Sequence, residues 1–140
     1  MPWWILSSLL SSGSGTSPVL DEGARVMAET QGKVILLNAE GCTGEDAELG
    51  FEILAAMLEA LAGREDVPKA IICWNTAVRL LVQGSPLLKY LKRLEEKGVS
   101  ILAGQLCVNE LELTGKMAVG KVATMGKILD LILHNDVVSL

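Results

Sequence analysis

Three cysteines, Cys42, Cys73 and Cys107, are the residues of this chain with the clearest capacity for chemistry. Cys107 follows the apolar run 99–103, which ends at Gly104, and it precedes a polar, acidic stretch. In an α/β domain the carboxyl ends of the strands are where ligands and reactive groups usually lie. A cysteine thiolate at that edge can act as a nucleophile. Cys107 is therefore the main candidate for a catalytic residue.

Each cysteine also has a structural interpretation. Leu106 and Val108 flank Cys107, and free cysteine is among the most frequently buried residues. No Lys or Arg is adjacent to Cys107, so activation would come from backbone amides, or from residues brought in by folding or by another subunit. Cys73 lies inside an apolar strand pattern and is expected in the core. Cys42 lies between glycines in a turn-prone segment and is expected to be exposed.

Metal and cofactor chemistry find little support in the sequence. The cysteines form no Cys-x-x-Cys pair and no zinc-ligand spacing, and three free cysteines fit a reducing, cytoplasmic compartment. With His134 as the one histidine, a histidine-rich metal site and a Ser-His-Asp triad are nearly excluded. The glycines beside Cys42 lack the lysine of a P-loop and the spacing of a dinucleotide fingerprint. We expect neither a metal nor a cofactor.

Length and composition predict one domain built mainly from aliphatic residues. The 140 residues are enough for a substantial core, and half are hydrophobic although few are aromatic. The net charge of −5 argues against nucleic-acid binding, which needs clustered basic residues. The group Lys89, Lys92, Arg93 and Lys97 is interrupted by acidic residues and is expected to be a solvated helix face. No apolar run approaches the length of a membrane span.

Residues 1–32 are expected to be a flexible leader. The segment contains a Ser/Gly-rich stretch, and its short apolar run has no Lys or Arg before Arg25, unlike a signal peptide. Trp3 and Trp4 either dock on the domain or on a neighbouring subunit, or belong to an unstructured tail.

From residue 33 onward, strand and helix patterns alternate. Apolar runs predict strands at 33–38, 70–74, 99–103 and 137–140. Helices are expected after residue 44, where Leu49, Ile53, Met57 and Leu61 recur on one face, after the Ser85 cap, and over 124–134, with a short helix at 77–82. Residues 116–119 fit either a strand or an extended connection. This alternation predicts a three-layer α/β domain over 33–140, with a mostly parallel sheet flanked by helices.

Parallel strands share a carboxyl edge, and several polar or reactive residues follow these strands. The residues expected to line a pocket beside Cys107 at this edge are Asn38, Cys42, Asn75, Thr76 and Asn109. Glu45, Asp46 and Glu48 stand at the start of a helix, where acidic residues complement the helix dipole. We interpret them as capping residues rather than as paired catalytic carboxylates.

From Lys33 to its end the sequence resembles the DsrE-like domain of sulfurtransferase-like selenium-metabolism proteins of the YedF type. The resemblance rests on segments spread along the chain: Asn38, 48–50, 84–87, 94–99, 101–102, Cys107 and 118–120. In that family the segment after the third strand commonly reads Cys-Gly-Thr-Cys. Cys107 falls on the second cysteine and Gly104 on the first, while the Gly-Arg-Gly before the family's first helix is absent.

The resemblance implies a flavodoxin-like architecture and a sulfur or selenium relay through a persulfide on Cys107. It also implies a homo-oligomer, a trimer or hexamer or at least a dimer. Family members often carry a TusA-like amino-terminal domain, which we expect to be absent because the leader is too short to contain one, so a sulfur donor or TusA-like carrier would be a separate protein. One alternative is a non-catalytic oligomeric binding or scaffold module with the same fold. A cofactor binder of the flavodoxin type is the third possibility, and it ranks last because it rests on architecture alone.

Overall fold

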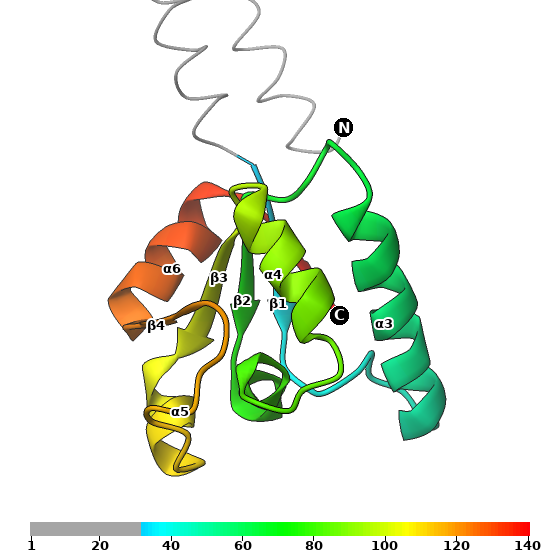
Figure 1. Ribbon diagram of the computed structural model, residues 1–140. Coiled ribbons are helices and arrows are strands. Elements are labelled where there is room, and N and C mark those ends of the chain that lie inside the picture. The colour runs from blue at the N-terminus through cyan, green and yellow to red at the C-terminus, as the bar shows by residue number, and fades with distance from the viewer. Residues whose placement is uncertain (1–31) are drawn as a thin grey trace, which may run out of the picture. The chain divides into compact units, whose positions relative to one another are not determined.

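The computed structural model describes residues 32–140, and within this range five strands form one parallel sheet (Figure 1). The strands are β1 (Lys33–Leu37), β2 (Ala70–Cys73), β3 (Ser100–Gly104), β4 (Lys121–Ala123) and β5 (Asp136–Ser139). Their order across the sheet is β4-β3-β2-β1-β5, and each neighbouring pair is parallel. The four predicted strands are confirmed to within one residue at each end. The sequence did not predict β4, which follows the ambiguous segment 116–119.

Helices connect the strands, as parallel pairing requires. They are α3 (Ala47–Ala62), the 3₁₀-helix η1 (Asn75–Leu81), α4 (Leu88–Glu96), α5 (Gln105–Glu110) and α6 (Met125–His134). The sequence pattern predicted each of them except α5. Six residues are too few to show a helical repeat, so this helix carries no clear periodic signal.

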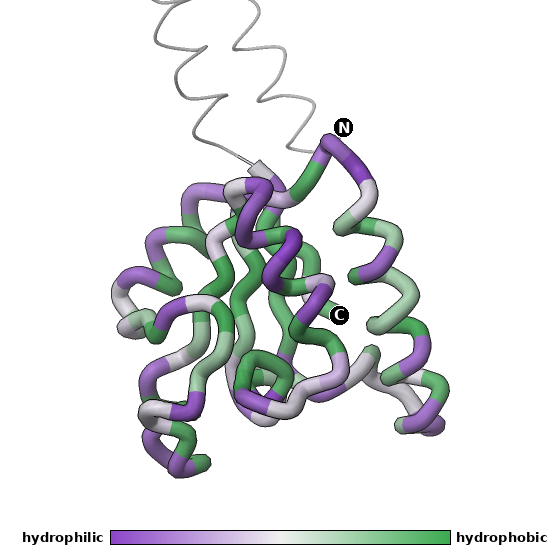
Figure 2. The backbone as a smooth tube through the Cα atoms, in the orientation of Figure 1, coloured by the Kyte–Doolittle hydropathy of each residue, from purple (hydrophilic) through white to green (hydrophobic). Residues whose placement is uncertain are grey.

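Apolar side chains fill both faces of the sheet, because successive strand residues point to opposite sides. Ile71 belongs to a large core with residues of α3, η1, α4 and α5, whereas Ile72 belongs to a smaller core that includes Ile128 of α6. In Figure 2 the hydrophobic strands run through the interior between the helices. The domain therefore has three layers, which confirms the predicted α/β class.

Helix α3 buries a different face from the one that its sequence spacing suggested. The expected face was Leu49, Ile53, Met57 and Leu61, but Leu49 and Ile53 are about half exposed. The residues that the helix buries are Gly50, Leu54, Leu58 and Ala62. Because α3 is apolar around most of its circumference, a four-residue spacing fits more than one face. Only packing against the sheet and α4 decides between them.

The cap of α3 agrees with the sequence interpretation, and α6 begins with a side-chain cap of the same kind. The Asp46 carboxylate accepts a hydrogen bond from the Leu49 N–H at 3.0 Å, as expected for an acidic residue before a helix. The Thr124 hydroxyl accepts one from the Lys127 N–H at 3.3 Å. In the last turn of α6, His134 Nδ1 lies 2.7 Å from the carbonyl oxygen of Asp130. His134 therefore makes a helix-terminal contact with the backbone of its own helix.

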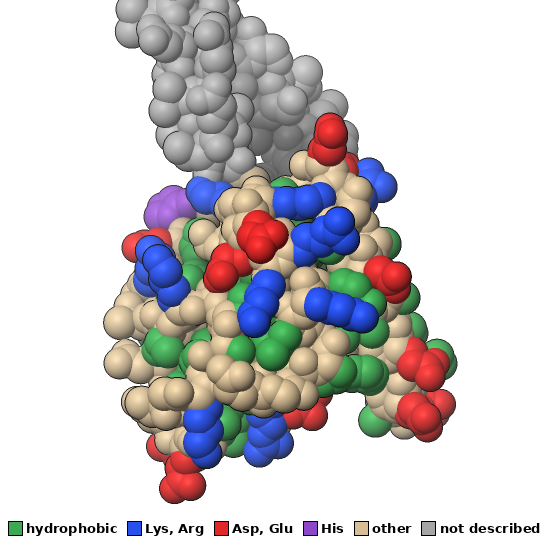
Figure 3. All heavy atoms as spheres, viewed as in Figure 1, with side chains coloured by type: hydrophobic (Ala, Val, Ile, Leu, Met, Phe, Trp, Pro, Cys, Tyr) green, Lys and Arg blue, Asp and Glu red, His purple; other side chains and the backbone are tan. Residues whose placement is uncertain are grey.

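The basic residues of α4 form a solvated surface. Lys and Arg side chains gather over this helix with acidic residues among them (Figure 3). Lys97 donates a hydrogen bond to the Arg64 carbonyl oxygen at 2.6 Å, and the Glu95 carboxylate accepts one from the Gly120 N–H at 2.9 Å. These contacts support the interpretation as a structural face. The predicted leader, with Trp3 and Trp4, lies outside the described residues except for Gly32.

Candidate functional site

Cys107 lies just beyond the carboxyl end of β3. Strand β3 ends at Gly104, α5 begins at the next residue, and Cys107 therefore occupies the first turn of α5. Its side chain is partly buried and packs against the larger core. The sequence placed the thiol correctly at the carboxyl end of this strand. The structure adds that a helix, rather than a loop, holds it there.

The sulfur of Cys107 accepts a hydrogen bond from the backbone N–H of Asn75, with an N···Sγ distance of 3.0 Å. Asn75 follows β2, the strand that pairs with β3. Its φ of +55° lies in the left-handed region, which asparagine adopts more readily than most residues. A hydrogen-bond donor stabilises negative charge on its acceptor. The backbone amide thus provides one hydrogen-bond donor to the sulfur, where no Lys or Arg is adjacent in sequence.

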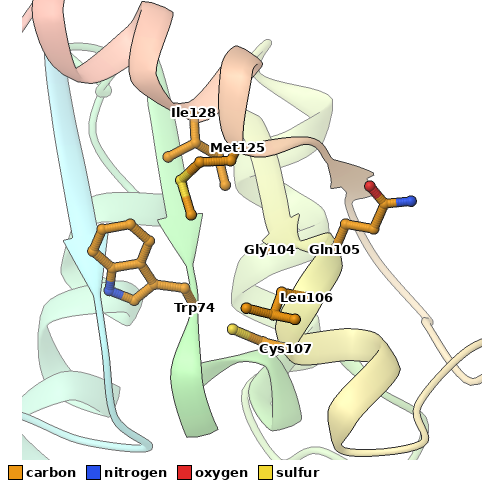
Figure 4. Close-up of a pocket in the computed structure, with 7 residues that line it drawn as sticks. All are labelled: Trp74, Gly104, Gln105, Leu106, Cys107, Met125 and Ile128. Atoms are coloured by element: carbon orange, nitrogen blue, oxygen red, sulfur yellow. The ribbon is translucent and has the colours of Figure 1, made fainter.

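A pocket of about 180 Å³ lies beside this sulfur. Its lining residues are Trp74, Gly104, Gln105, Leu106, Cys107, Met125 and Ile128. Figure 4 shows Met125 and Ile128 extending from α6 toward the Trp74 indole, while the Cys107 sulfur points to the space between Trp74 and Leu106. The pocket therefore lies between the carboxyl ends of β2 and β3 and the start of α6.

Gly104 lines this pocket with backbone atoms alone, because it has no side chain. A Cβ atom at this position would lie 3.5 Å from Cys107 Sγ and 3.4 Å from the Trp74 Cβ, which are ordinary contact distances. Its φ of −62° and ψ of 124° are accessible to any residue. Neither space nor backbone conformation therefore requires glycine here. A side chain at this position would extend directly beside the thiol.

Of the sequence-predicted neighbours, Asn75 makes a hydrogen bond to Cys107, and the other four lie elsewhere. Asn38 follows β1, and Thr76 lies within η1. Cys42 is partly buried against the core, and its N–H donates to the Gly50 carbonyl oxygen at 2.9 Å. Asn109 lies in α5, and its Oδ1 accepts a hydrogen bond of 3.4 Å from the Thr114 hydroxyl. Neither these four nor Asn75 lines the pocket beside Cys107, so the predicted lining was wrong.

Sequence reasoning missed the apolar residues that shape the pocket. Trp74 falls in the predicted strand 70–74 and Met125 in the predicted helix 124–134, and neither was expected to have a role in the site. One signal was present, since a large aromatic residue directly after a buried strand lies at the same sheet edge as Cys107. The approach of Met125 had no local signal, because it depends on how α6 crosses the sheet.

Cys73 is a core residue, as its sequence context indicated. Its side chain is fully buried in β2, and burial raises the pKa of this thiol to about 12. Desolvation disfavours the charged thiolate, so Cys73 stays protonated at neutral pH. It is therefore not a competing nucleophile in the folded domain.

Among residues 32–140 no group of three or more His, Cys, Asp and Glu side chains is arranged to hold a metal ion. In the same range, every helix is too short or too polar to cross a membrane.

No protein-family model matches the sequence, and no curated protein matches it. Solved structures do share its fold. The ychN protein from E. coli is 12% identical, with a TM-score of 0.56, and the match covers 79% of this chain and 100% of that chain. The protein MTH1491 from Methanobacterium thermoautotrophicum is 18% identical, with a TM-score of 0.57 and coverages of 77% and 98%.

A third structure, BT1422 from Bacteroides thetaiotaomicron, is 20% identical, with a TM-score of 0.52 and coverages of 77% and 94%. MTH1491 and BT1422 are described as proteins of unknown function. At such low identities the likeness shows the fold alone. The chain therefore shares its α/β fold with the ychN protein, whose fold is DsrE-like, and this is consistent with the fold that the sequence resemblance implied.

Proposed function

We propose that this chain is a small sulfur-relay protein in which Cys107 accepts sulfane sulfur, or selenium in its place, and passes it on. The observation that carries the proposal is the position of the Cys107 sulfur at the mouth of a pocket, where the Asn75 N–H donates to it at 3.0 Å. The DsrE-like fold and the YedF-type pattern around Cys107 support the same chemistry.

A relay of this kind needs only one thiol. The thiolate of Cys107 attacks the outer sulfur of a persulfide donor, R–S–SH, and the donor's S–S bond breaks. Its electron pair leaves with R–S⁻, and Cys107 becomes Cys–S–SH. The amide of Asn75 is placed to stabilise negative charge on the sulfur before attack and on the leaving sulfur during onward transfer. Gly104 in place of a second cysteine is therefore compatible with the proposal.

The proposed partners are a separate sulfur donor, such as a TusA-like carrier, and an acceptor protein. We place the reaction in the cytoplasm, because a persulfide relay needs a reduced thiol and all three cysteines are free. Incubation of the purified protein with a persulfide donor, followed by intact-mass measurement, tests the function. We expect one added sulfur atom, located by peptide mapping on Cys107. A chain that gains no sulfur under these conditions would contradict the proposal.

Exposed apolar side chains support a homo-oligomer, which both the relay proposal and the scaffold alternative include. Leu129 and Leu133 of α6 are 45% and 73% exposed, and Leu49 and Ile53 of α3 are about half exposed. Apolar surface of this kind commonly lies in subunit contacts. We expect light scattering to give at least a dimer, with a smaller assembly after Leu129→Glu and Leu133→Glu are combined. A monomeric wild-type protein would exclude the oligomer.

We expect Gly104→Cys to form a disulfide with Cys107 under mild oxidation. The new Cβ would lie 3.5 Å from Cys107 Sγ. An S–S bond of about 2.04 Å puts each Cβ about 3 Å from the opposite sulfur, so a small adjustment of the two side chains brings the sulfurs within bonding distance. The measurement is a thiol count with peptide mapping. Gln105→Cys is the matched control, because the Gln105 side chain points away from Cys107 (Figure 4). Equal thiol counts in the two oxidised variants would contradict the geometry.

A further inference from the structure

The pocket beside Cys107 is apolar, although the residue that would react in it is a nucleophile. Trp74, Leu106, Met125 and Ile128 supply most of its lining, and no described lining residue carries a charged side chain. Gln105 is the single amide side chain among them, and it points away from the pocket (Figure 4). The side chains around the sulfur therefore offer contact for hydrocarbon and no counter-charge for an anion.

An apolar lining without charged side chains disfavours anionic sulfur donors relative to donors that carry an uncharged organic group. Thiosulfate and other sulfur oxyanions are strongly hydrated, and they would lose that hydration without gaining a cationic partner. Proteins that bind such anions supply Arg, Lys or clustered N–H donors. The N–H of Asn75, a donor beside the pocket, is already directed at Cys107 Sγ. An uncharged organic group instead gains by leaving water for the pocket.

The size of the pocket limits the organic group. A cavity of about 150 Å³ lined by apolar side chains holds a benzene molecule. The volume here is about 180 Å³, so it suits a ring or a short alkyl chain attached to sulfur. Leu106 and Met125, at 65% and 52% exposed, extend the apolar contact to the rim.

We infer that Cys107 takes its sulfur from low-molecular-weight persulfides of uncharged, apolar thiols rather than from thiosulfate or related oxyanions. The inference rests on the proposed function, for which it specifies the donor class. The Cys107 thiolate bonds to the outer sulfur of R–S–SH while the S–S bond of the donor breaks. R–S⁻ leaves with the electron pair and takes a proton from water, Cys–S–SH forms, and no external oxidant or reductant is needed.

The test compares the rates at which Cys107 gains one sulfur from benzyl hydropersulfide and from thiosulfate, followed by intact mass. The same rates at Cys107 in the denatured chain, where peptide mapping separates Cys107 from Cys42 and Cys73, remove the intrinsic difference between the two reagents. We expect folding to raise the ratio of benzyl hydropersulfide to thiosulfate loading by about tenfold or more, which corresponds to about 1.4 kcal/mol of differential binding. An unchanged or lower ratio, with loading still observed, would overturn the donor class and leave the relay function intact.

A lysine at the rim should reverse the preference. Met125→Lys places a cation beside the sulfur, and we expect it to lower the ratio of benzyl hydropersulfide to thiosulfate loading by about tenfold. Leu133→Lys is the control, since it adds the same charge to the same helix about 12 Å further along. Leu106→Lys is a second test variant at an exposed position of the pocket.

The outcomes separate the two proposals. A ratio lowered by Met125→Lys and Leu106→Lys but not by Leu133→Lys supports the apolar donor pocket. Equal effects of all three lysines would overturn it. A folded wild-type protein that gains sulfur from neither reagent contradicts the relay function itself, and the donor inference with it.

Discussion

Replacing Cys107 with serine is expected to abolish sulfur loading of the folded protein. The hydroxyl has nearly the same size and can still accept the Asn75 N–H, so the fold and the local hydrogen bond should survive. A serine hydroxyl cannot form a stable persulfide, so the acceptor chemistry is lost while the structure remains. Intact-mass measurement of wild type and Cys107→Ser after the same exposure to a persulfide donor shows the effect directly.

The other two cysteines provide the controls. Cys73 is fully buried with a pKa of about 12, and we expect it to gain no sulfur until the chain unfolds. Cys42→Ser should load as the wild type does, because Cys42 packs against the core and does not line the pocket. Loading of Cys107→Ser to the wild-type level would exclude Cys107 as the acceptor.

Native thiol alkylation separates the relay from the scaffold alternative. The relay requires Cys107 to react with a small neutral reagent such as iodoacetamide in the folded protein, whereas Cys73 reacts only after denaturation. If Cys107 also reacts only after denaturation, the pocket is closed to reagents of that size. The fold would then serve as a binding or scaffold module.

Gly50→Ala is expected to destabilise the domain by about 2–4 kcal/mol, in the range of the larger effects of single substitutions. The segment after β1 packs directly on α3, and the Cys42 N–H donates to the Gly50 carbonyl oxygen at 2.9 Å. A Cβ on Gly50 would lie 2.2 Å from the Cys42 carbonyl oxygen, a separation that side-chain movement cannot relieve. Urea unfolding of the two proteins measures the loss.

A helical glycine without such a contact gives the matched control. Gly126 lies in the first turn of α6, is exposed, and would place its Cβ no nearer than 3.9 Å to the Thr124 hydroxyl. There alanine should stabilise by about 0.5–1 kcal/mol, since it is the better helix former. If Gly50→Ala is likewise neutral or stabilising, the close packing of the segment after β1 on α3 is not required for stability.

The successes and failures of sequence reasoning have a common physical basis. Strands β1, β2 and β3 were predictable because each is a short apolar run that a parallel sheet buries on both sides. Asp46 and Thr124 were predictable positions for helix starts because capping acts within one turn. The buried face of α3 was not predictable, because exposed and buried positions are both apolar, as at Leu49, Ile53, Leu54 and Leu58. Their spacing therefore does not show which of them the domain buries.

The same distinction applies to the candidate site. The sequence by itself determined that a cysteine follows the third strand, and that Asn75 follows the second strand at the same edge. These are consequences of local pattern and of the shared direction of parallel strands. Only the tertiary structure decided that the Asn75 N–H meets the Cys107 sulfur across 32 residues of chain. Likewise, it decided that Trp74 and Met125 form an apolar pocket around that sulfur. Contacts of this kind depend on how helices cross the sheet and how residues distant in sequence pack, and no local pattern records them.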